Sequence, residues 1–297
     1  MMKKDRKYLP GSEWVYFKIY TGYKTGDDLL IKKIFPLLKK YEKLNYIDKF
    51  FFIRYADPNF HLRIRMHLVQ VNYLGEILID FNNNFSKLLK DNTVWKIQTD
   101  TYVRELERYN FNLIDQVESF FHIDSIFILE ILSFIRKKMN NNDENRWLIG
   151  LSLIDNTLNL FHDDDSKKFD LMFIMSESFK NEFGFNKHNS KQFNERFRAH
   201  KEKVEKVMNY EKVIEENDFT HLYKILEKRR KALLPIVLEL KKNQIKYRIE
   251  QDMISDLIHM VINRLIPAKN RLHELLLYDF AKRYYSSIIA RKMDKKL

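Results

Sequence analysis

The spacing of apolar residues changes about a third of the way along this 297-residue chain. Near the start, three short segments alternate in polarity or are rich in aromatic and β-branched residues, which favours strands: residues 14–20, 50–55 and 61–67. From about residue 112, apolar residues recur three and four positions apart, as on one face of a helix. With six glycines and five prolines in the chain, turn residues are scarce and long helices are favoured.

This pattern predicts an α+β fold, with a small antiparallel sheet in the N-terminal third and a mostly helical remainder. The second and third strands should pair antiparallel, because Asp57 and Pro58 supply a turn between them. We expect a single domain over residues 1–297, β-rich over about 10–110 and helical over about 111–297.

Some helix boundaries can be predicted from local residue types. Asp27 and Asp28 are expected to cap a helix over residues 28–43. Residues 137–145, with their run of asparagines, are expected to form an exposed loop. Pro267 should interrupt the last helical stretch, because proline lacks the amide that a helix interior needs.

The composition excludes several classes of site. The chain has no cysteine, which rules out disulfides, thiolate metal sites and cysteine nucleophiles. It contains no HExxH, GxGxxG or P-loop pattern, so we expect neither a metal nor a cofactor. The basic N-terminus lacks the apolar run of a signal peptide, and no window is apolar enough to span a membrane. A cytoplasmic protein is therefore expected.

The formal net charge of +12 favours anionic partners. An acidic peptide, a membrane surface and nucleic acid all fit that charge, but no zinc-finger, RRM or KH pattern supports nucleic-acid binding. The alternative is that most lysines lie on solvated faces, without a partner.

A cluster of basic residues lies on the third predicted strand. Strand alternation places His61, Arg63 and Arg65 on one face. Neighbouring cations repel one another unless an anion neutralises them, and a guanidinium group binds a carboxylate through two parallel hydrogen bonds. The pattern is typical of a site for a carboxylate ligand, although a solvated face paired with surface acids would have the same pattern.

Two further pairs could carry chemistry. Glu105 and Arg108 are three residues apart and could pair on a helical turn, where such an ion pair contributes about 0–1 kcal/mol. His259 and Asn263 share a helix face among apolar residues, which disfavours the charged imidazole and keeps it available as an acid or base. The structural alternative for His259 is a core histidine whose hydrogen bonds are satisfied.

Together these segments resemble the C-terminal elimination domain of class I lantibiotic dehydratases, also called the thiopeptide-type bacteriocin biosynthesis domain. The resemblance rests on residues 11–22, 51–65, 102–109, 257–265 and 271–280. It implies a lyase that removes glutamate from glutamylated Ser or Thr of a ribosomally made precursor peptide, leaving dehydroalanine or dehydrobutyrine. The implied partners are that peptide, with its leader and glutamylated core, and a separate glutamylation-domain protein that completes a split dehydratase. Direct contact with nucleic acid is not expected, and the sequence leaves a homodimer open.

The resemblance also assigns roles to residues. Arg65 and Arg108 are expected to hold the glutamyl carboxylates and the enolate, with Arg63 as the alternative to Arg65. His259 is expected to transfer the proton, while Glu105 orients Arg108 or acts as the base in its place. These side chains should converge in one pocket sized for a small dicarboxylate. Further substrate contacts are expected from Arg54, His61, Asn263, Arg264 and Tyr285.

Two other functions remain open from the sequence. The pyridine synthases of thiopeptide pathways are similar across this family, and join two dehydroalanines in a formal [4+2] cycloaddition with loss of the leader. Polar side chains over residues 284–287 could serve that reaction, although Tyr and Ser are also common on helix exteriors. The chain could also be a non-catalytic subunit that docks the peptide.

Overall fold

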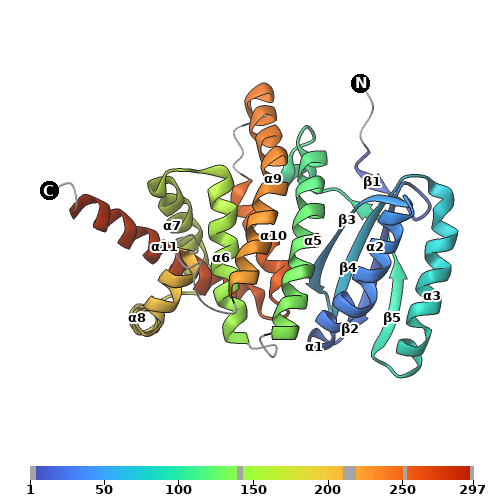
Figure 1. The fold of residues 1–297 in the computed structure, drawn as a ribbon, viewed down its shortest axis with the longest axis horizontal. Coiled ribbons are helices and arrows are strands. Elements are labelled where there is room, and N and C mark those ends of the chain that lie inside the picture. Colours follow the sequence, from blue (N-terminus) through green and yellow to red (C-terminus); the bar gives the residue numbers. More distant parts are fainter. Residues whose placement is uncertain (1–4, 139–142, 210–218, 250–252, 295–297) are drawn as a thin grey trace. The chain divides into compact units, whose positions relative to one another are not determined.

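The computed structural model describes residues 5–138, 143–209, 219–249 and 253–294. The chain divides into two compact units (Figure 1). The first, here called the sheet unit, comprises Met1–Ser133 and Ala232–Gln251. The second, the helical unit, comprises Phe134–Lys231 and Asp252–Leu297. The loop expected over residues 137–145 falls partly on residues 139–142, which lie outside the described part of the chain.

The sheet unit contains a four-stranded antiparallel sheet with strand order β3-β4-β2-β5. A two-stranded ribbon pairs β1 with β6, also antiparallel. The expected pairing of the second and third strands is confirmed, and the fold is α+β with its sheets near the N-terminus. The strand bounds are β1 Lys7–Tyr8, β2 Trp14–Thr21, β3 Ile47–Ala56, β4 Phe60–Leu68, β5 Val94–Thr99 and β6 Tyr102–Val103.

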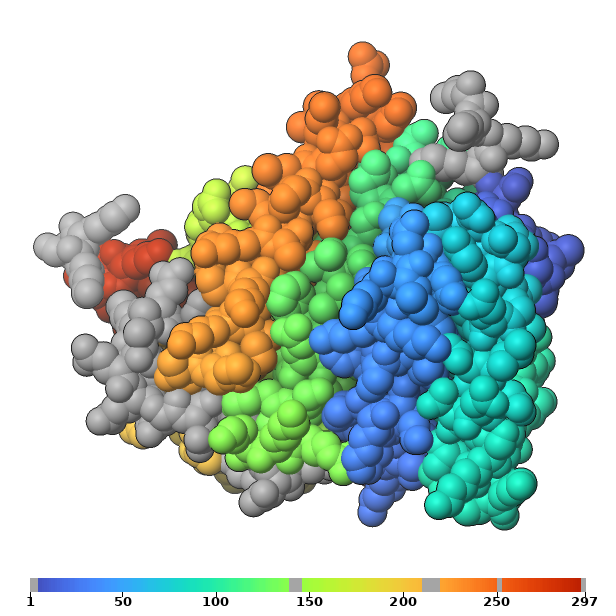
Figure 2. Space-filling view, turned by 45° about the vertical axis from the view of Figure 1, so that its right-hand side comes forward, coloured from blue at the N-terminus to red at the C-terminus, as the bar shows by residue number. Residues whose placement is uncertain are grey.

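Helices cover the apolar face of this sheet. Leu62, Ile64 and Met66 point to that face and are fully buried. The Phe17 and Phe81 rings stack there at 4.2 Å, which fixes α3 against the sheet. Figure 2 shows α2 and α3 side by side on this part of the surface. The helices of the first third are α1 Tyr23–Leu29, a π-helical turn Leu30–Ile34, α2 Phe35–Lys43, a 3-10 turn Val71–Tyr73 and α3 Leu74–Lys90.

The start of the first helix differs from the prediction. The helix begins at Tyr23, with Gly22 at its N-cap, so Asp27 and Asp28 lie inside it and do not cap it. Asp27 is buried and pairs with Arg54 at 2.5 Å. Burying a guanidinium without a carboxylate costs more free energy than leaving a helix end without a side-chain cap. The pairing of Asp27 with Arg54 therefore explains why an acid lies inside the helix.

Helix α5, Ile114–Lys138, covers the edge of the sheet. On the edge strand β3, the backbone amide of Phe50 donates to the Nδ1 of His122 at 3.1 Å. The backbone amide of Phe52 donates to the Oγ of Ser125 at 3.3 Å. Side chains of the helix therefore satisfy edge groups that would otherwise be open to another strand. The short helix α4, Leu106–Tyr109, and the long helix α9, Phe219–Tyr247, complete the helices that enter this unit.

The helical unit is a set of packed helices. Helix α7 lies along α11, where the Phe179 and Tyr278 rings meet edge to face at 5.1 Å. The break expected at Pro267 is confirmed, because one helix ends at Leu265 and the next begins at Asn270. None of the helices in the described ranges is long and apolar enough to cross a membrane. The helix bounds are α6 Asp143–Phe161, α7 Asp165–Glu182, α8 Lys187–Met208, α10 Ile254–Leu265 and α11 Asn270–Asp294.

Candidate functional site

The polar face of the sheet carries a row of basic and aromatic side chains, here called the arginine face. Strand register places Tyr16 opposite Arg65 and Lys18 opposite Arg63. His61 follows on the same face of β4, two residues from Arg63. The structure therefore brings together His61, Arg63 and Arg65, as strand alternation predicted.

Arg65 is buried against aromatic rings. Its guanidinium carbon lies 4.7 Å from the centre of the Tyr16 ring, 4.7 Å from that of Tyr102 and 5.3 Å from that of Phe51. The residue is 8% exposed, and its buried Nε has no hydrogen-bond acceptor. Within the described residues no carboxylate pairs with it. The rings stabilise the cation, but they leave its hydrogen-bond donors to another partner.

Arg63 is held by its neighbours in a different way. Its guanidinium stacks over the Tyr55 ring at 3.5 Å, and its Nε donates to the Nε2 of His61 at 3.1 Å. The Nδ1 of His61 in turn lies 2.9 Å from the carbonyl of Asn59. Burial lowers the pKa of His61, as does the positive charge of Arg63. A neutral imidazole with its proton on Nδ1 donates to the Asn59 carbonyl and accepts from Arg63 at Nε2. His61 therefore positions Arg63.

One acid lies at the side of the arginine face. Asp100 forms an ion pair with Lys18 and accepts a hydrogen bond from the backbone amide of Thr101. Burial by itself would raise the pKa of Asp100, but the hydrogen bonds from Lys18 and Thr101 outweigh it and lower that pKa. Because this carboxylate is already paired with Lys18, the charge of Arg65 stays available for a ligand.

A buried ion pair beneath this face was missed by sequence reasoning. Arg104 donates to both carboxylate oxygens of Glu118, at 2.7 and 2.6 Å, and the Tyr102 hydroxyl donates to the same Glu118 at 2.8 Å. The Glu118 side chain is 1% exposed. This network fixes the Tyr102 ring against Arg65. Because Glu118 lies 14 residues beyond Arg104 on another element, sequence spacing gave no sign of the pair.

The other predicted residues of the sheet unit pair with acids or bases of their own. Glu105 and Arg108 pair at 3.2 Å across α4, with side chains 60% and 43% exposed. Arg54 pairs in register with Leu62 and so lies on the opposite, apolar face of the sheet. There it is 2% exposed and is bound to Asp27, so the structure does not group it with His61, Arg63 and Arg65.

In the helical unit, His259 on α10 pairs with an acid on α11. Its Nδ1 lies 2.5 Å from the Oε1 of Glu274, which also accepts the Tyr278 hydroxyl at 2.8 Å. Glu274 is fully buried, whereas the His259 side chain is 29% exposed. Burial, and then the negative charge of Glu274, raise the pKa of Tyr278 far above its usual range. Because a carboxylate only accepts, the imidazole proton is placed on Nδ1, which leaves Nε2 as a base.

Glu274 lies within a segment that carried the resemblance, but its role could not be read from the sequence. Asn263 and Arg264, which were also predicted to contact substrate, differ from each other in burial. Asn263 is half-buried one turn beyond His259 on α10. Arg264 is fully buried, and its Nη1 donates to the backbone carbonyl of Met260 at 3.2 Å. The expected convergence of these residues in one pocket stays a prediction.

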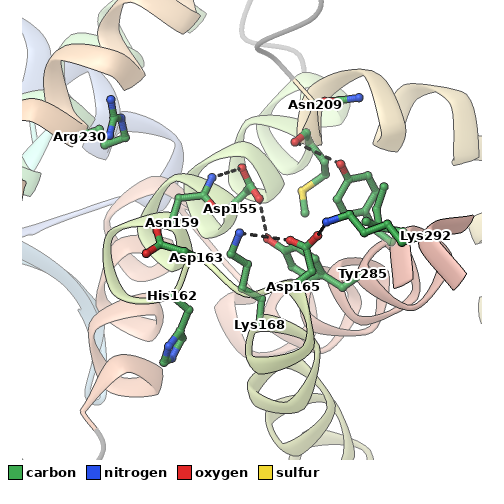
Figure 3. A pocket seen from close by; sticks show the side chains of 13 residues that line it. Asp155, Asn159, His162, Asp163, Asp165, Lys168, Asn209, Arg230, Tyr285 and Lys292 are labelled. Carbon is green, nitrogen blue, oxygen red and sulfur yellow. Dashed lines mark hydrogen bonds and ion pairs between the residues drawn. The ribbon is translucent and has the colours of Figure 1, made fainter. Parts of the chain in front are cut away.

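Tyr285 lines a polar cavity of about 550 Å³ in the helical unit, shown in Figure 3. Its hydroxyl donates to the Oδ1 of Asp155 at 2.5 Å, and the amide of Asn159 donates to the other oxygen at 2.9 Å. Burial raises the pKa of Asp155 to about 6, although both hydrogen bonds oppose this. Lys168 and Lys292 both pair with Asp165 at the same cavity. His259 does not line it, so Tyr285 and His259 belong to separate places in the unit.

The described residues contain no group of three or more His, Cys, Asp or Glu side chains that could hold a metal ion. The clusters instead offer guanidinium groups, an imidazole paired with a carboxylate, and phenol hydroxyls. Such groups can bind a carboxylate and move a proton.

The sequence is similar to those of known proteins over almost its whole length. A family model described as the C-terminal domain of lantibiotic biosynthesis dehydratases matches residues 14–285. The nisin biosynthesis protein NisB of Lactococcus lactis subsp. lactis is 25% identical over 289 residues, which cover 95% of this chain and 26% of NisB. The chain thus spans about a quarter of the length of the curated relatives it matches.

Two solved structures share the fold. The tRNA-dependent lantibiotic dehydratase MibB from Microbispora sp. 107891 matches with a TM-score of 0.73 and 18% identity, over 95% of this chain and 29% of MibB. The pyridine synthase TbtD from thiomuracin biosynthesis matches with a TM-score of 0.57 and 13% identity, over 93% of this chain and 99% of TbtD. At these identities the two matches support the fold and do not choose between the two activities.

Proposed function

Because the chain belongs to the family of lantibiotic biosynthesis dehydratase C-terminal domains, we propose that it is a lyase that removes glutamate from glutamylated Ser or Thr of a precursor peptide. The product would carry dehydroalanine or dehydrobutyrine in place of the modified residue. The chain spans about a quarter of the length of the relatives it matches. The glutamate is proposed to be attached by a glutamylation activity that the described residues do not supply.

The observation that carries this proposal is the buried guanidinium of Arg65, which pairs with no carboxylate among the described residues. A buried cation without a carboxylate partner is costly, and a substrate that brings a carboxylate would offset that cost. A glutamyl ester has one free carboxylate, and its ester group becomes a second when the bond breaks. Arg65 and Arg63 are proposed to bind these groups through parallel hydrogen bonds.

His259 is proposed to act as the base. The hydrogen bond from Nδ1 to Glu274 sets the tautomer and stabilises the imidazolium that forms once Nε2 has taken a proton. In the reaction Nε2 would take the Cα proton to leave an enolate, whose electron pair would then form the Cα–Cβ double bond as the Cβ–O bond breaks. The electron pair of that bond would leave with glutamate as a carboxylate. Arg108 is proposed to stabilise the enolate, with Glu105 as its orienting acid or as an alternative base.

A direct test uses the purified protein and a synthetic peptide that carries a glutamyl ester on one serine. Mass spectrometry should show loss of glutamate, and a thiol should then add to the new alkene. A matched peptide with a glutaminyl ester lacks the free carboxylate and should react far more slowly, because Arg65 would have no anion to bind. If both esters survive unchanged, the elimination proposal is wrong.

The second candidate is the pyridine synthase activity of TbtD, which is kept because this chain covers 99% of TbtD and shares its fold. Offering the protein a leader-bearing peptide with two dehydroalanines separates the two. Formation of a pyridine ring with loss of the leader, and no reaction of the glutamyl ester, would support the cycloaddition. A docking subunit would transform neither substrate, yet would raise the dehydration yield of its partner protein.

A further inference from the structure

Five ionisable side chains meet where α7 packs along α11, here called the lysine–aspartate cluster. Lys180 contacts Asp279 at 2.8 Å and Glu177 at 2.9 Å. Lys282 contacts the same two oxygens, at 3.0 Å to Glu177 and 3.4 Å to Asp279. The fifth member, Arg283, donates to the second oxygen of Asp279 at 2.5 Å.

The charges of this cluster do not balance. Three cations share two carboxylates, so the cluster carries one positive charge in excess. The side chains of Asp279, Lys180 and Lys282 are 0%, 13% and 15% exposed, whereas those of Arg283 and Glu177 are 25% and 41% exposed, so water screens that excess only in part. Burial lowers the pKa of Lys282, and the neighbouring Lys180 lowers it further. An incoming anion would relieve this repulsion.

The cluster opens into a cavity of about 460 Å³ in the helical unit. Lys282 and Arg283 form its basic side, and Ser286, one turn further along α11, adds a hydroxyl. Phe169, Phe173 and Phe197 also line it. Lys282 Nζ lies 5.6 Å from the centre of the Phe173 ring, and the Arg283 guanidinium carbon lies 5.7 Å from that of Phe197. Phe173 is 47% exposed, so its ring is open to a ligand. A cavity in which cations lie beside phenyl rings fits a ligand that is apolar at one end and anionic at the other.

We propose that this cavity binds an organic carboxylate whose apolar part is about the size of a phenyl ring. The carboxylate lies against Lys282 and Arg283, and the apolar part lies among the three phenylalanine rings. A free aromatic acid and the C-terminal residue of a peptide share this chemistry. The inference does not depend on the elimination activity, because the cluster contains none of the residues assigned to that reaction.

Binding can be measured by isothermal titration and saturation-transfer NMR with the full chain. The probes are N-acetyl-L-phenylalanine, its C-terminal amide and 3-phenylpropanoate. The acid should bind at least about tenfold more tightly than the amide, which has the same shape without the charge. Binding of both acids identifies a site for small aromatic acids, and binding of the acetylated amino acid alone identifies a peptide terminus.

Three variants make the test specific. Lys282→Met keeps an unbranched apolar stem but removes the charge, and should weaken binding of the acid about tenfold. Ser286→Trp fills the cavity from an exposed position without changing any charge, and should also abolish binding. Lys292→Met removes a charge from the same helix outside this cavity, and should bind as the unaltered protein does. Equal affinity for acid and amide, or unchanged binding by both Lys282→Met and Ser286→Trp, overturns the proposal.

Discussion

The Nδ1 of His259 lies 2.5 Å from the Oε1 of Glu274, so a fully buried carboxylate orients a partly exposed imidazole. If His259 is the base, Glu274→Gln should lower the elimination rate by roughly 10²-fold, because the tautomer and the imidazolium lose their support. The KM for the glutamyl peptide should change little, since Glu274 does not touch substrate. Tyr278→Phe removes the hydroxyl that donates to the same Glu274 oxygen and keeps the carboxylate, so it serves as a control with a much smaller loss. Rates for Glu274→Gln equal to those of the unaltered protein would exclude the orienting role.

Replacing Arg65 should separate stability from activity. Its guanidinium is buried among aromatic rings, and no carboxylate in the described part of the chain pairs with it. Arg65→Met should therefore leave the free energy of unfolding unchanged or slightly raised. The same variant should lose binding of the glutamyl peptide, because the anion loses its partner. Urea unfolding and peptide titration measure the two effects. A variant that unfolds much more readily would indicate a structural cation.

The Arg104–Glu118 pair should behave in the opposite way. Arg104→Met leaves the carboxylate of Glu118 buried without its cation, so we expect a loss of about 3–5 kcal/mol in the free energy of unfolding. Arg108→Met, in the same motif but 43% exposed, should cost less than about 1 kcal/mol. Chemical denaturation of both variants measures the two losses in the free energy of unfolding. Similar losses would contradict this prediction.

The pH dependence of stability should carry a contribution from Asp155. Burial raises its pKa from the usual 3.8 to about 6, so the folded protein holds this proton more tightly than the unfolded chain. The stabilising contribution is therefore complete below pH 3.8 and is lost as the pH rises through about 6, a change on the order of 3 kcal/mol. Melting curves of Asp155→Asn should lack this loss. Asp163→Asn, on the exposed rim of the same cavity, should keep it.

Local patterns anticipated much of the fold. Alternation over residues 61–67 identified β4 and the face shared by His61, Arg63 and Arg65, because successive side chains of a strand point to opposite sides. Pro267 marked the break before α11, because proline cannot continue a helix. Alternation along β3 could not by itself place Arg54 relative to Arg65, because the shared face depends on the register, in which Arg54 pairs with Leu62.

The sequence by itself determined the α+β class, the strand-rich first third followed by helices, and the family, since these depend on periodicity and on motifs within short segments. The tertiary structure decided which charged groups are neutralised. Glu118 meets Arg104, Glu274 meets His259 and Asp27 meets Arg54 across elements that are distant in the chain. Arg65 meets aromatic rings, and no described carboxylate pairs with it. The physical reason is that burial and partner distance set the energy of a charge, and both arise only when separate segments pack together.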